Sequence, residues 1–296
     1  MASILSTDSE NIMQPKNKLS SILEWGTLVG STILVCFFLL VILWEIFSKG
    51  SSVITWEFIR SLPTEGMTKG GILTPIIGTV MLTLLTALFS IPFGVCCAIY
   101  LNEYAESNWL TRLIRASIRN LSGVPSIIYG LFGLALFVQG LQLGTSLLAA
   151  GLTLGLLSLP YIITTTEEAL LRIPNSTREA ALAVGATKFE TIKDIVLPSS
   201  MSGILTGVVL TLSRAAGETA PILFTGAAFY INQTSVSVNQ EFMALPYHLY
   251  MLSTQHQSID EVRPIAYGTA LVLVIVVFLM NLTAFYIRYT YRQHEK

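Results

Sequence analysis

The stretch RIPNSTREAALAVGATKFETIKDIVLPSS, residues 172–200, decides the fold of this chain because it joins two long apolar runs and is itself polar. The tetrapeptides STRE (176–179) and TKFE (187–190) each match the S/T-x-x-E capping box that opens a helix. Gly185 lies between them and suits the left-handed turn that ends a helix. The stretch therefore predicts two short helices joined by a glycine turn.

The composition is that of a polytopic membrane protein. Of the 296 residues, 52% are hydrophobic and 12% are charged, with a mean hydropathy of +0.66. A soluble domain has about 25% charged residues. The net charge of −1 gives no basis for nucleic-acid binding. Cys36, Cys96 and Cys97 lie in apolar runs without metal-ligand spacing, so we interpret them as packing residues.

Six segments are apolar enough, at about 20 residues, to be predicted as membrane-spanning helices. The third is the weakest, because Gly123 and Pro125 interrupt it. The polar N-terminus is too long to be a cleavable signal peptide and is expected to be a tail. The predicted spans are 22–47, 72–101, 122–141, 147–168, 201–229 and 264–288. The predicted parts are an N-terminal tail (1–21), a first span (22–47), an outer loop (48–71), a core (72–290) that contains the loop 172–200, and a C-terminal tail (291–296).

The basic residues predict the orientation of these spans. Of the 17 Lys and Arg residues, twelve lie on the side of the N-terminus, four lie on the other side, and Arg214 lies inside a span. Because Lys and Arg concentrate on the cytoplasmic side, both termini and the loop 172–200 are expected to be cytoplasmic.

The predicted outer loop 230–262 contains EFMALPYHLYML (241–252), which is apolar but too short to span. It is expected to be an interfacial or re-entrant piece. His248 and His256 lie in this loop without a cluster of further ligands, so we do not predict a metal site there.

Two charges interrupt the fifth predicted span, TGVVLTLSRAAGETAPILFTGAAF. Arg214 and Glu218 are four residues apart, so they are expected on one helix face about 20 Å from the start of the span, near the bilayer middle. Gly217 and Pro221 flank Glu218, and the proline is expected to kink the helix. Gly217 and Thr219 complete the candidate substrate pathway with the two charged residues.

Two interpretations of the pair remain open. Arg214 and Glu218 could neutralise each other and only fix helix packing, although a buried pair is often no more stable than apolar residues of the same volume. Alternatively, they form an anion site, since guanidinium matches phosphate oxygens with two parallel hydrogen bonds and Glu218 could accept a P–OH proton. Ionisable residues inside membranes are usually functional, which favours the second interpretation.

The loop 172–200 resembles the coupling motif, or EAA loop, of ABC-importer permeases. The resemblance implies an all-α, six-span permease of the type I fold, whose cytoplasmic coupling helices dock on a separate ATPase. This chain has no G-x-x-x-x-G-K-[ST] motif, so ATP is expected to bind, with Mg²⁺, only on that partner, and the chain is expected to be neither an enzyme nor a cofactor-binding protein. The matching positions are Glu179, Ala180, Ala181, Gly185, Ile195, Leu197 and Pro198.

Further blocks resemble the A-type permease of phosphate-specific ABC importers. The resemblance implies a bacterial inner-membrane heterodimer with a C-type permease, two ATP-binding subunits and a periplasmic phosphate-binding protein. The alternatives are a permease for another oxyanion and, against the coupling motif, an ion-coupled carrier. The matching blocks are GVPSIIYGLFGLALF (123–137), LSRAAGETAPILFTGA (212–227), MALPYHLY (243–250) and YGTALVLV (267–274), together with the coupling loop.

Overall fold

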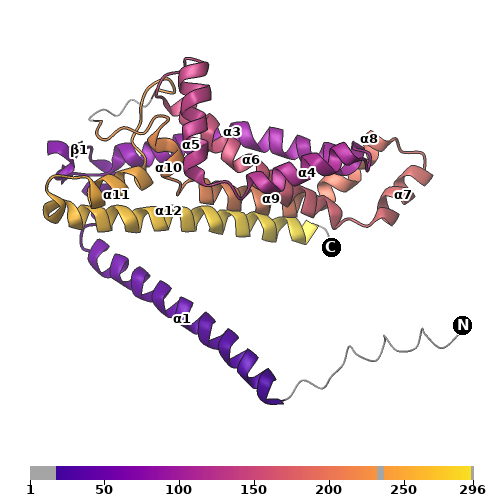
Figure 1. The fold of residues 1–296 in the computed structure, drawn as a ribbon, viewed down its shortest axis with the longest axis horizontal. Helices are drawn as coiled ribbons and strands as arrows, with labels where there is room; N and C mark the ends of the chain where they lie inside the picture. The colour runs from indigo at the N-terminus through magenta and orange to yellow at the C-terminus, as the bar shows by residue number, and fades with distance from the viewer. Residues whose placement is uncertain (1–17, 232–236, 295–296) are drawn as a thin grey trace, which may run out of the picture. The chain divides into compact units, whose positions relative to one another are not determined.

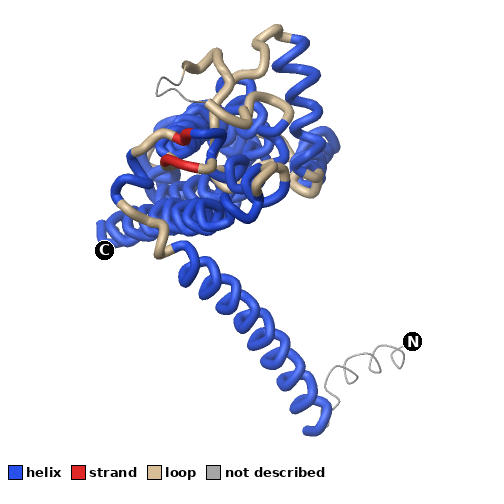
Figure 2. Tube along the Cα trace, turned by 90° about the vertical axis from the view of Figure 1, so that its left-hand side faces the viewer, coloured by secondary structure: helices blue, strands red, loops and turns tan. Residues whose placement is uncertain are grey.

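The computed structural model describes residues 18–231 and 237–294, which are almost entirely helical (Figures 1 and 2). The long helices are α1 (Lys18–Gly50), α3 (Leu73–Ile99), α6 (Leu147–Leu171), α9 (Leu197–Ala215) and α12 (Ile259–His294). The shorter helices are α2 (Trp56–Arg60), α4 (Trp109–Leu121), α5 (Ser126–Gly133), α7 (Asn175–Ala183), α8 (Lys188–Glu190), α10 (Ala220–Leu223) and α11 (Leu245–Thr254). Short π-helical segments extend α3 (η2, Tyr100–Tyr104), extend α5 (η3, Leu134–Gly140) and link α8 to α9 (η4, Thr191–Val196).

The chain divides between Ser48 and Lys49 into two compact units. The first contains α1 up to Ser48, and most of the described side chains of this helix are exposed and apolar, including Phe37 and Phe38. The second contains all the other helices and a small antiparallel hairpin, β1 (Pro63–Thr64) with β2 (Lys69–Gly70), joined by the 3₁₀ turn η1 (Glu65–Met67). Within this second unit, α7 and α8 lie at one end of the long helices, and α11 and β1 lie at the opposite end (Figure 1).

Five helical runs within the described residues are long and apolar enough to cross a membrane, and a bent helix pair raises the number to six. The five runs are Trp25–Gly50, Leu73–Tyr104, Leu147–Leu171, Lys188–Ala215 and Ile259–Thr290. The prediction of an all-helical membrane protein is therefore confirmed.

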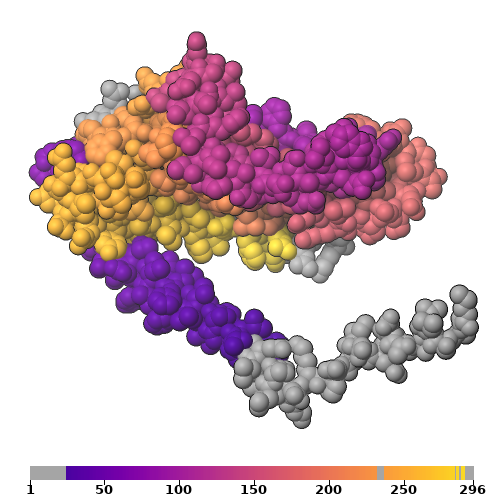
Figure 3. Space-filling model, in the orientation of Figure 1, coloured from indigo at the N-terminus to yellow at the C-terminus, as the bar shows by residue number. Residues whose placement is uncertain are grey.

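The third predicted span, 122–141, has a different form from the expected straight helix. Its helical part is α5 with η3, and α4 meets it at 102°. Pro125 is the N-cap residue of α5 (φ −55°, ψ 138°), and its ring fixes φ near this value. The bend at Gly123–Pro125 turns α5 across the direction of the long helices, and α5 protrudes from them in the space-filling view (Figure 3).

Glycines bring α6 close to its two neighbours. A Cβ atom on Gly155 would lie 2.5 Å from the ring of Phe89 in α3, and one on Gly207 of α9 would lie 2.4 Å from Thr165 Oγ1 in α6. Gly151 and Gly203 make comparable approaches to Leu85 and Ala169. The small residues therefore allow α3, α6 and α9 to pack closely, as is typical of helices in lipid.

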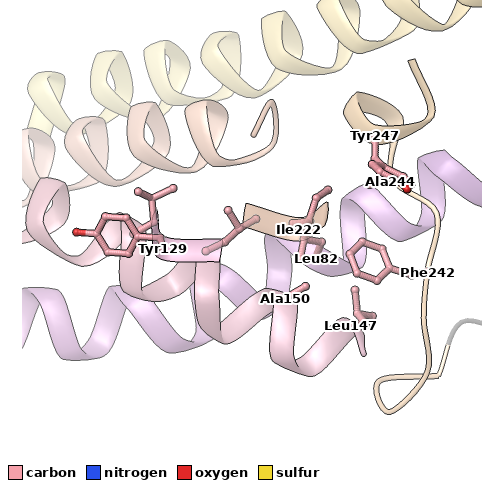
Figure 4. Packing of buried hydrophobic residues seen from close by; sticks show 10 residues of the cluster. Leu82, Tyr129, Leu147, Ala150, Ile222, Phe242, Ala244 and Tyr247 are labelled. Atoms are coloured by element: carbon pink, nitrogen blue, oxygen red, sulfur yellow. The ribbon is translucent and has the colours of Figure 1, made fainter. Parts of the chain in front are cut away.

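A buried apolar cluster anchors the segment that follows α9. Ile222 of α10 packs with Leu82 of α3, Leu147 of α6 and Phe242, and each of the four is at most 2% exposed (Figure 4). Tyr129 of α5 joins this cluster and donates a hydrogen bond to the carbonyl oxygen of Leu121 (2.9 Å). The cluster fixes α10 in place. It thereby fixes the segment that follows the interruption of the helix after Arg214.

Candidate functional site

The helix that carries Arg214 starts earlier and ends earlier than predicted. It runs without interruption from Lys188 to Ala215, through α8, η4 and α9, instead of from 201 to 229. Pro198 lies in the first turn of α9 and does not interrupt the helical run. The π-helical turn η4 precedes it, so no regular α-helical hydrogen bond from the nitrogen of residue 198 is needed. Arg214 thus lies about 39 Å along the run from Lys188, at 1.5 Å per residue, and in its last turn.

The chain leaves the helix within RAAGET. The amide of Gly217 donates to the carbonyl oxygen of Arg214 (3.0 Å), and that of Glu218 donates to Ala215 (3.1 Å), so the hydrogen bonds shorten to an i→i+3 pattern. Pro221 then lies in the first turn of the new helix α10, where its missing N–H costs nothing. The expected kink at Pro221 is therefore a complete break, and Arg214 and Glu218 do not share one continuous helix face.

The two charged side chains nevertheless meet across this break. Arg214 Nε lies 3.5 Å from Glu218 Oε1, and the side chains are 53% and 16% exposed, respectively. The Arg214 guanidinium also lies over the ring of Tyr161 in α6, with its carbon 4.4 Å from the ring centroid, which is a cation–π contact. Tyr161 is held in turn, because its hydroxyl donates to the carbonyl oxygen of Ser122 (2.7 Å). The guanidinium is therefore fixed from two sides and still presents an open face.

The cavity at this pair is too small for an oxyanion. It holds about 10 Å³ between Tyr161, Arg214, Glu218 and their neighbours on α6 and α9. A single water needs about 10–15 Å³. Of the other predicted pathway residues, Gly217 is exposed and Thr219 is half-buried at the start of α10. A larger site at Arg214 would need a further wall beyond the residues that line this cavity.

The coupling loop forms two short helices at one end of the long-helix bundle. Gly185 adopts the predicted left-handed conformation (φ +92°) between α7 and α8. The capping box of Thr187 and Glu190 is confirmed, since each side chain bonds the backbone of the other. The predicted box at Ser176 is wrong, because Pro174 is the N-cap and Ser176 lies inside the first turn of α7.

The motif positions of the loop divide between its surface and its interior. Ala181 is 4% exposed, and Ile195 and Leu197 are half-buried. Glu179, Ala180, Gly185 and Pro198 are exposed. Large apolar side chains beside them also lie open: Leu182 (50%), Val184 (86%) and Phe189 (65%). Such an exposed apolar patch at the polar end of a bundle is typical of a protein-binding surface.

Sequence reasoning missed a buried ion pair that ties the coupling loop to the membrane helices. Arg178 of α7 binds both oxygens of Glu103 in η2, through Nη2 (2.7 Å) and Nε (3.2 Å). It also donates to the carbonyl oxygens of Ile173 (2.6 Å) and Leu170 (3.1 Å) at the end of α6. Arg178 thus joins α7, α3 and α6. Its position directly before the EAA triplet was the available signal, but the partner is 75 residues away and no local spacing indicates it.

A second pair and the Tyr161 contact were also missed. Arg115 of α4 lies 3.4 Å from Glu167 of α6 and donates to the carbonyl oxygen of Leu101 (2.7 Å). A polar stripe along α6, in which Tyr161 and Thr165 are followed by Glu168, was the signal available for Tyr161. Within the part of the chain that the structure describes, no group of three His, Cys, Asp or Glu side chains could hold a metal ion.

The family model described as "Binding-protein-dependent transport system inner membrane component" matches residues 90–293. The chain belongs to this family. It is therefore a multi-pass inner-membrane permease subunit of an ABC importer and is not itself catalytic. Such a permease works with separate ATPase subunits and a periplasmic binding protein.

Curated relatives cover most of the chain. "Phosphate transport system permease protein PstA" of Yersinia pestis is 33% identical over 271 residues, which are 91% of this chain and 88% of that protein. The protein of the same name from Pasteurella multocida is 32% identical over 91% of this chain and 93% of its own length. "Probable ABC transporter permease protein YqgI" of Bacillus subtilis is 31% identical over 80% of this chain and 84% of its own length.

Solved ABC importers share the fold. A subunit of a bacterial alginate ABC transporter, in complex with its alginate-bound periplasmic protein, matches with a TM-score of 0.64 at 16% identity, over 90% of this chain and 93% of its own. The MetNI methionine transporter in an inward-facing conformation matches with a TM-score of 0.59 at 20% identity, over 74% of this chain and 95% of its own. The predicted ABC-importer permease fold is confirmed.

Proposed function

We propose that this permease forms half of a pathway that imports inorganic phosphate, as an A-type subunit paired with a C-type permease. Two ATP-binding subunits would drive it, and a periplasmic phosphate-binding protein would deliver the ion. The relatives named PstA support the substrate class. Both termini and the coupling loop would face the cytoplasm, in keeping with the excess of Lys and Arg there.

The observation that carries the proposal is the half-open Arg214 guanidinium. A charged group at this place in a membrane chain is costly against lipid, so its exposed face would meet a water-filled path or a second subunit. The cavity of about 10 Å³ at the pair supports the same view, since a phosphate site there would need a second wall from the C-type partner.

Arg214 would then bind the ion, and Glu218 would select for it and favour its release. Arg214, held by Tyr161, would offer its free N–H groups to phosphate oxygens. Glu218 would accept the P–OH proton of hydrogen phosphate, which fully ionised sulfate lacks, and would weaken retention by its negative charge. Gly217 and Thr219 would line the path where the broken helix exposes its backbone, an arrangement common around transport sites.

The coupling loop would transmit the movement of the ATPase. The exposed side chains of Glu179, Leu182 and Phe189 would dock in that partner, in the manner of a helix in a groove. Because α8, η4 and α9 form one helical run, a displacement of α8 would reach Arg214 along a single rigid element.

Substrate competition in the reconstituted transporter tests the proposal. Proteoliposomes that contain both permeases, the ATPase and external binding protein should take up radiolabelled phosphate only when ATP is enclosed. Excess sulfate should leave this uptake unchanged. The Glu218→Gln variant should keep ATP dependence and take up phosphate more slowly, since a neutral amide oxygen accepts the P–OH proton more weakly than a carboxylate does. Equal competition by sulfate in the unaltered transporter would indicate a general oxyanion permease, and uptake without ATP would indicate an ion-coupled carrier.

A further inference from the structure

The groove between α6 and α9 continues past Arg214 towards the coupling loop. On α6, Tyr161, Thr165, Glu168 and Arg172 recur at intervals of four, three and four residues, which places them on one face. Gly203, Gly207, Leu210 and Arg214 recur at the same intervals on α9. The two faces oppose each other, since Thr165 lies against Gly207 and Tyr161 lies under Arg214. A polar track therefore leads from the Arg214 site to the end of the bundle that carries α7.

A second, much larger cavity lies at that end of the track. Its volume is about 280 Å³, against about 10 Å³ at Arg214. Arg172 at the end of α6 and Arg288 of α12 both line it, together with Glu168 and the hydroxyl-bearing Ser202 and Thr206. At 1.5 Å per residue along α9, its lining extends from Gly203, about 16 Å from Arg214, to Leu210, about 6 Å from Arg214.

The charges of this cavity are not balanced within the described part of the chain. Neither Arg172 nor Arg288 has a hydrogen-bond or carboxylate partner among residues 18–231 and 237–294. Two guanidinium groups and one Glu168 carboxylate leave a formal charge of +1 on one concave wall. The general excess of basic residues at cytoplasmic ends accounts for two arginines on this side of the membrane but not for their meeting, from two helices, around one cavity.

The chemistry of the lining suits a phosphate group. Guanidinium groups bind phosphate oxygens by paired, charge-assisted hydrogen bonds. The Ser202 hydroxyl makes no hydrogen bond within the described part of the chain and is free to donate. Thr206 already donates to the carbonyl oxygen of Ser202 (2.6 Å). Glu168 lies in the same cavity as the two arginines, as Glu218 lies beside Arg214. Its negative charge would keep the binding of an anion weak.

We propose that this cavity is a weak binding site for a phosphate group at the coupling-loop end of the α6–α9 groove. The inference rests on the proposed function, because its ligand is the free phosphate that Arg214 releases. A phospholipid headgroup carries the same chemistry and is the alternative source. Arg172 stands three residues before α7, so movement of the coupling loop would open or close the site.

A cysteine-protection experiment on the complete transporter tests the proposal. Leu210→Cys places a reporter in the cavity wall without altering a proposed ligand, in a chain whose Cys36, Cys96 and Cys97 are replaced by Ser. Labelling by a neutral maleimide is measured on this chain by mass spectrometry, with inorganic phosphate or chloride at equal ionic strength. When phosphate reaches about ten times its Kd, labelling should slow about tenfold, because the free fraction follows mass action.

Two lipid compositions distinguish the sources. Protection by phosphate in phosphatidylcholine nanodiscs identifies the free ion. Protection that needs only added phosphatidylglycerol identifies a headgroup. In both lipids, protection from labelling should vanish in the double variant Arg172→Gln/Arg288→Gln. It should persist in the control Arg112→Gln/Arg119→Gln, which removes two exposed arginines of α4. No protection in either lipid, or protection that survives loss of Arg172 and Arg288, overturns the proposal. Arg214→Gln should stop uptake and leave protection intact, so this inference and the proposed function can fail separately.

Discussion

His248 is the most deeply buried ionisable side chain outside the spans of the described chain. It lies in α11, is 1% exposed, and neither ring nitrogen has a hydrogen-bond partner among the described residues. Burial, with a smaller effect from the charge of His256, lowers the pKa of His248 from 6.5 to about 4. The folded protein therefore holds this ring neutral, in a helix (α11) that packs against α12.

This burial predicts an acid-sensitive fold. Between pH 6.5 and 4 the unfolded chain binds a proton at His248 that the folded chain does not, so the free energy of unfolding falls as the pH falls through that window. At 1.36 kcal/mol per pKa unit, the loss is about 3 kcal/mol. Thermal unfolding of the transporter across this window should show the slope, and His248→Leu should flatten it. His256→Leu is the control, since that ring is partly exposed. An equal slope in both variants would contradict the assignment.

At the same scale, the sequence indicated the contact of Arg214 with Glu218 but not its geometry. The i, i+4 spacing was enough to bring the two side chains together, because the i→i+3 turns at Gly217 and Glu218 keep them close after the helix ends. The cation–π contact with Tyr161 could not be predicted in the same way. It depends on how α6 packs against α9, which small residues permit and no local pattern specifies.

Among the helical elements, α7 depends most on one long-range contact. Helices of fewer than about 12 residues are marginal alone, and α7 has nine. Arg178 supplies the missing support through Glu103 and two carbonyl oxygens at the end of α6. The side chains of the pair are 16% and 6% exposed, so water screens it little.

Removing one partner should therefore loosen the coupling loop. Arg178→Gln leaves the Glu103 carboxylate buried without its cation, which costs about 3–5 kcal/mol in buried pairs. We expect lower thermal stability, faster amide hydrogen exchange in α7 and weaker co-purification of the ATPase. The matched control is Lys69→Gln, whose partner Glu65 is exposed, with an expected effect of about 0–1 kcal/mol. Equal protection of α7 in both variants would show that the pair does not hold the loop.

The element boundaries mark where local patterns stop being informative. The Thr187 capping box and the Gly185 turn were predicted correctly because each depends on neighbouring residues only. The expected start of the span at residue 201 and the expected helix through Phe229 were wrong. In the first case a π-helical turn accommodates the proline, and in the second buried contacts of Ile222 hold α10 apart from α9.

For the whole molecule, composition and the coupling motif were sufficient to predict a helical ABC-importer permease. Long apolar runs and the fixed spacing of seven motif residues do not depend on tertiary detail. The bend of 102° between α4 and α5 and the cavity at Arg172 and Arg288 do depend on it. Both bring together residues from different helices, so only the folded chain reveals them.

The central claim is that Arg214 lies on the phosphate path, and initial uptake by Arg214→Gln tests it most directly. The complete transporter, reconstituted with ATP inside and loaded phosphate-binding protein outside, is compared with Arg263→Gln, which removes an exposed arginine paired with Asp260. With equal amounts of assembled complex, we predict that Arg214→Gln lowers the rate of radiolabelled phosphate uptake by about a hundredfold or more, as expected for a lost charge-assisted contact of about 3 kcal/mol, and that Arg263→Gln transports normally. Near-normal uptake by assembled Arg214→Gln transporter would contradict the account.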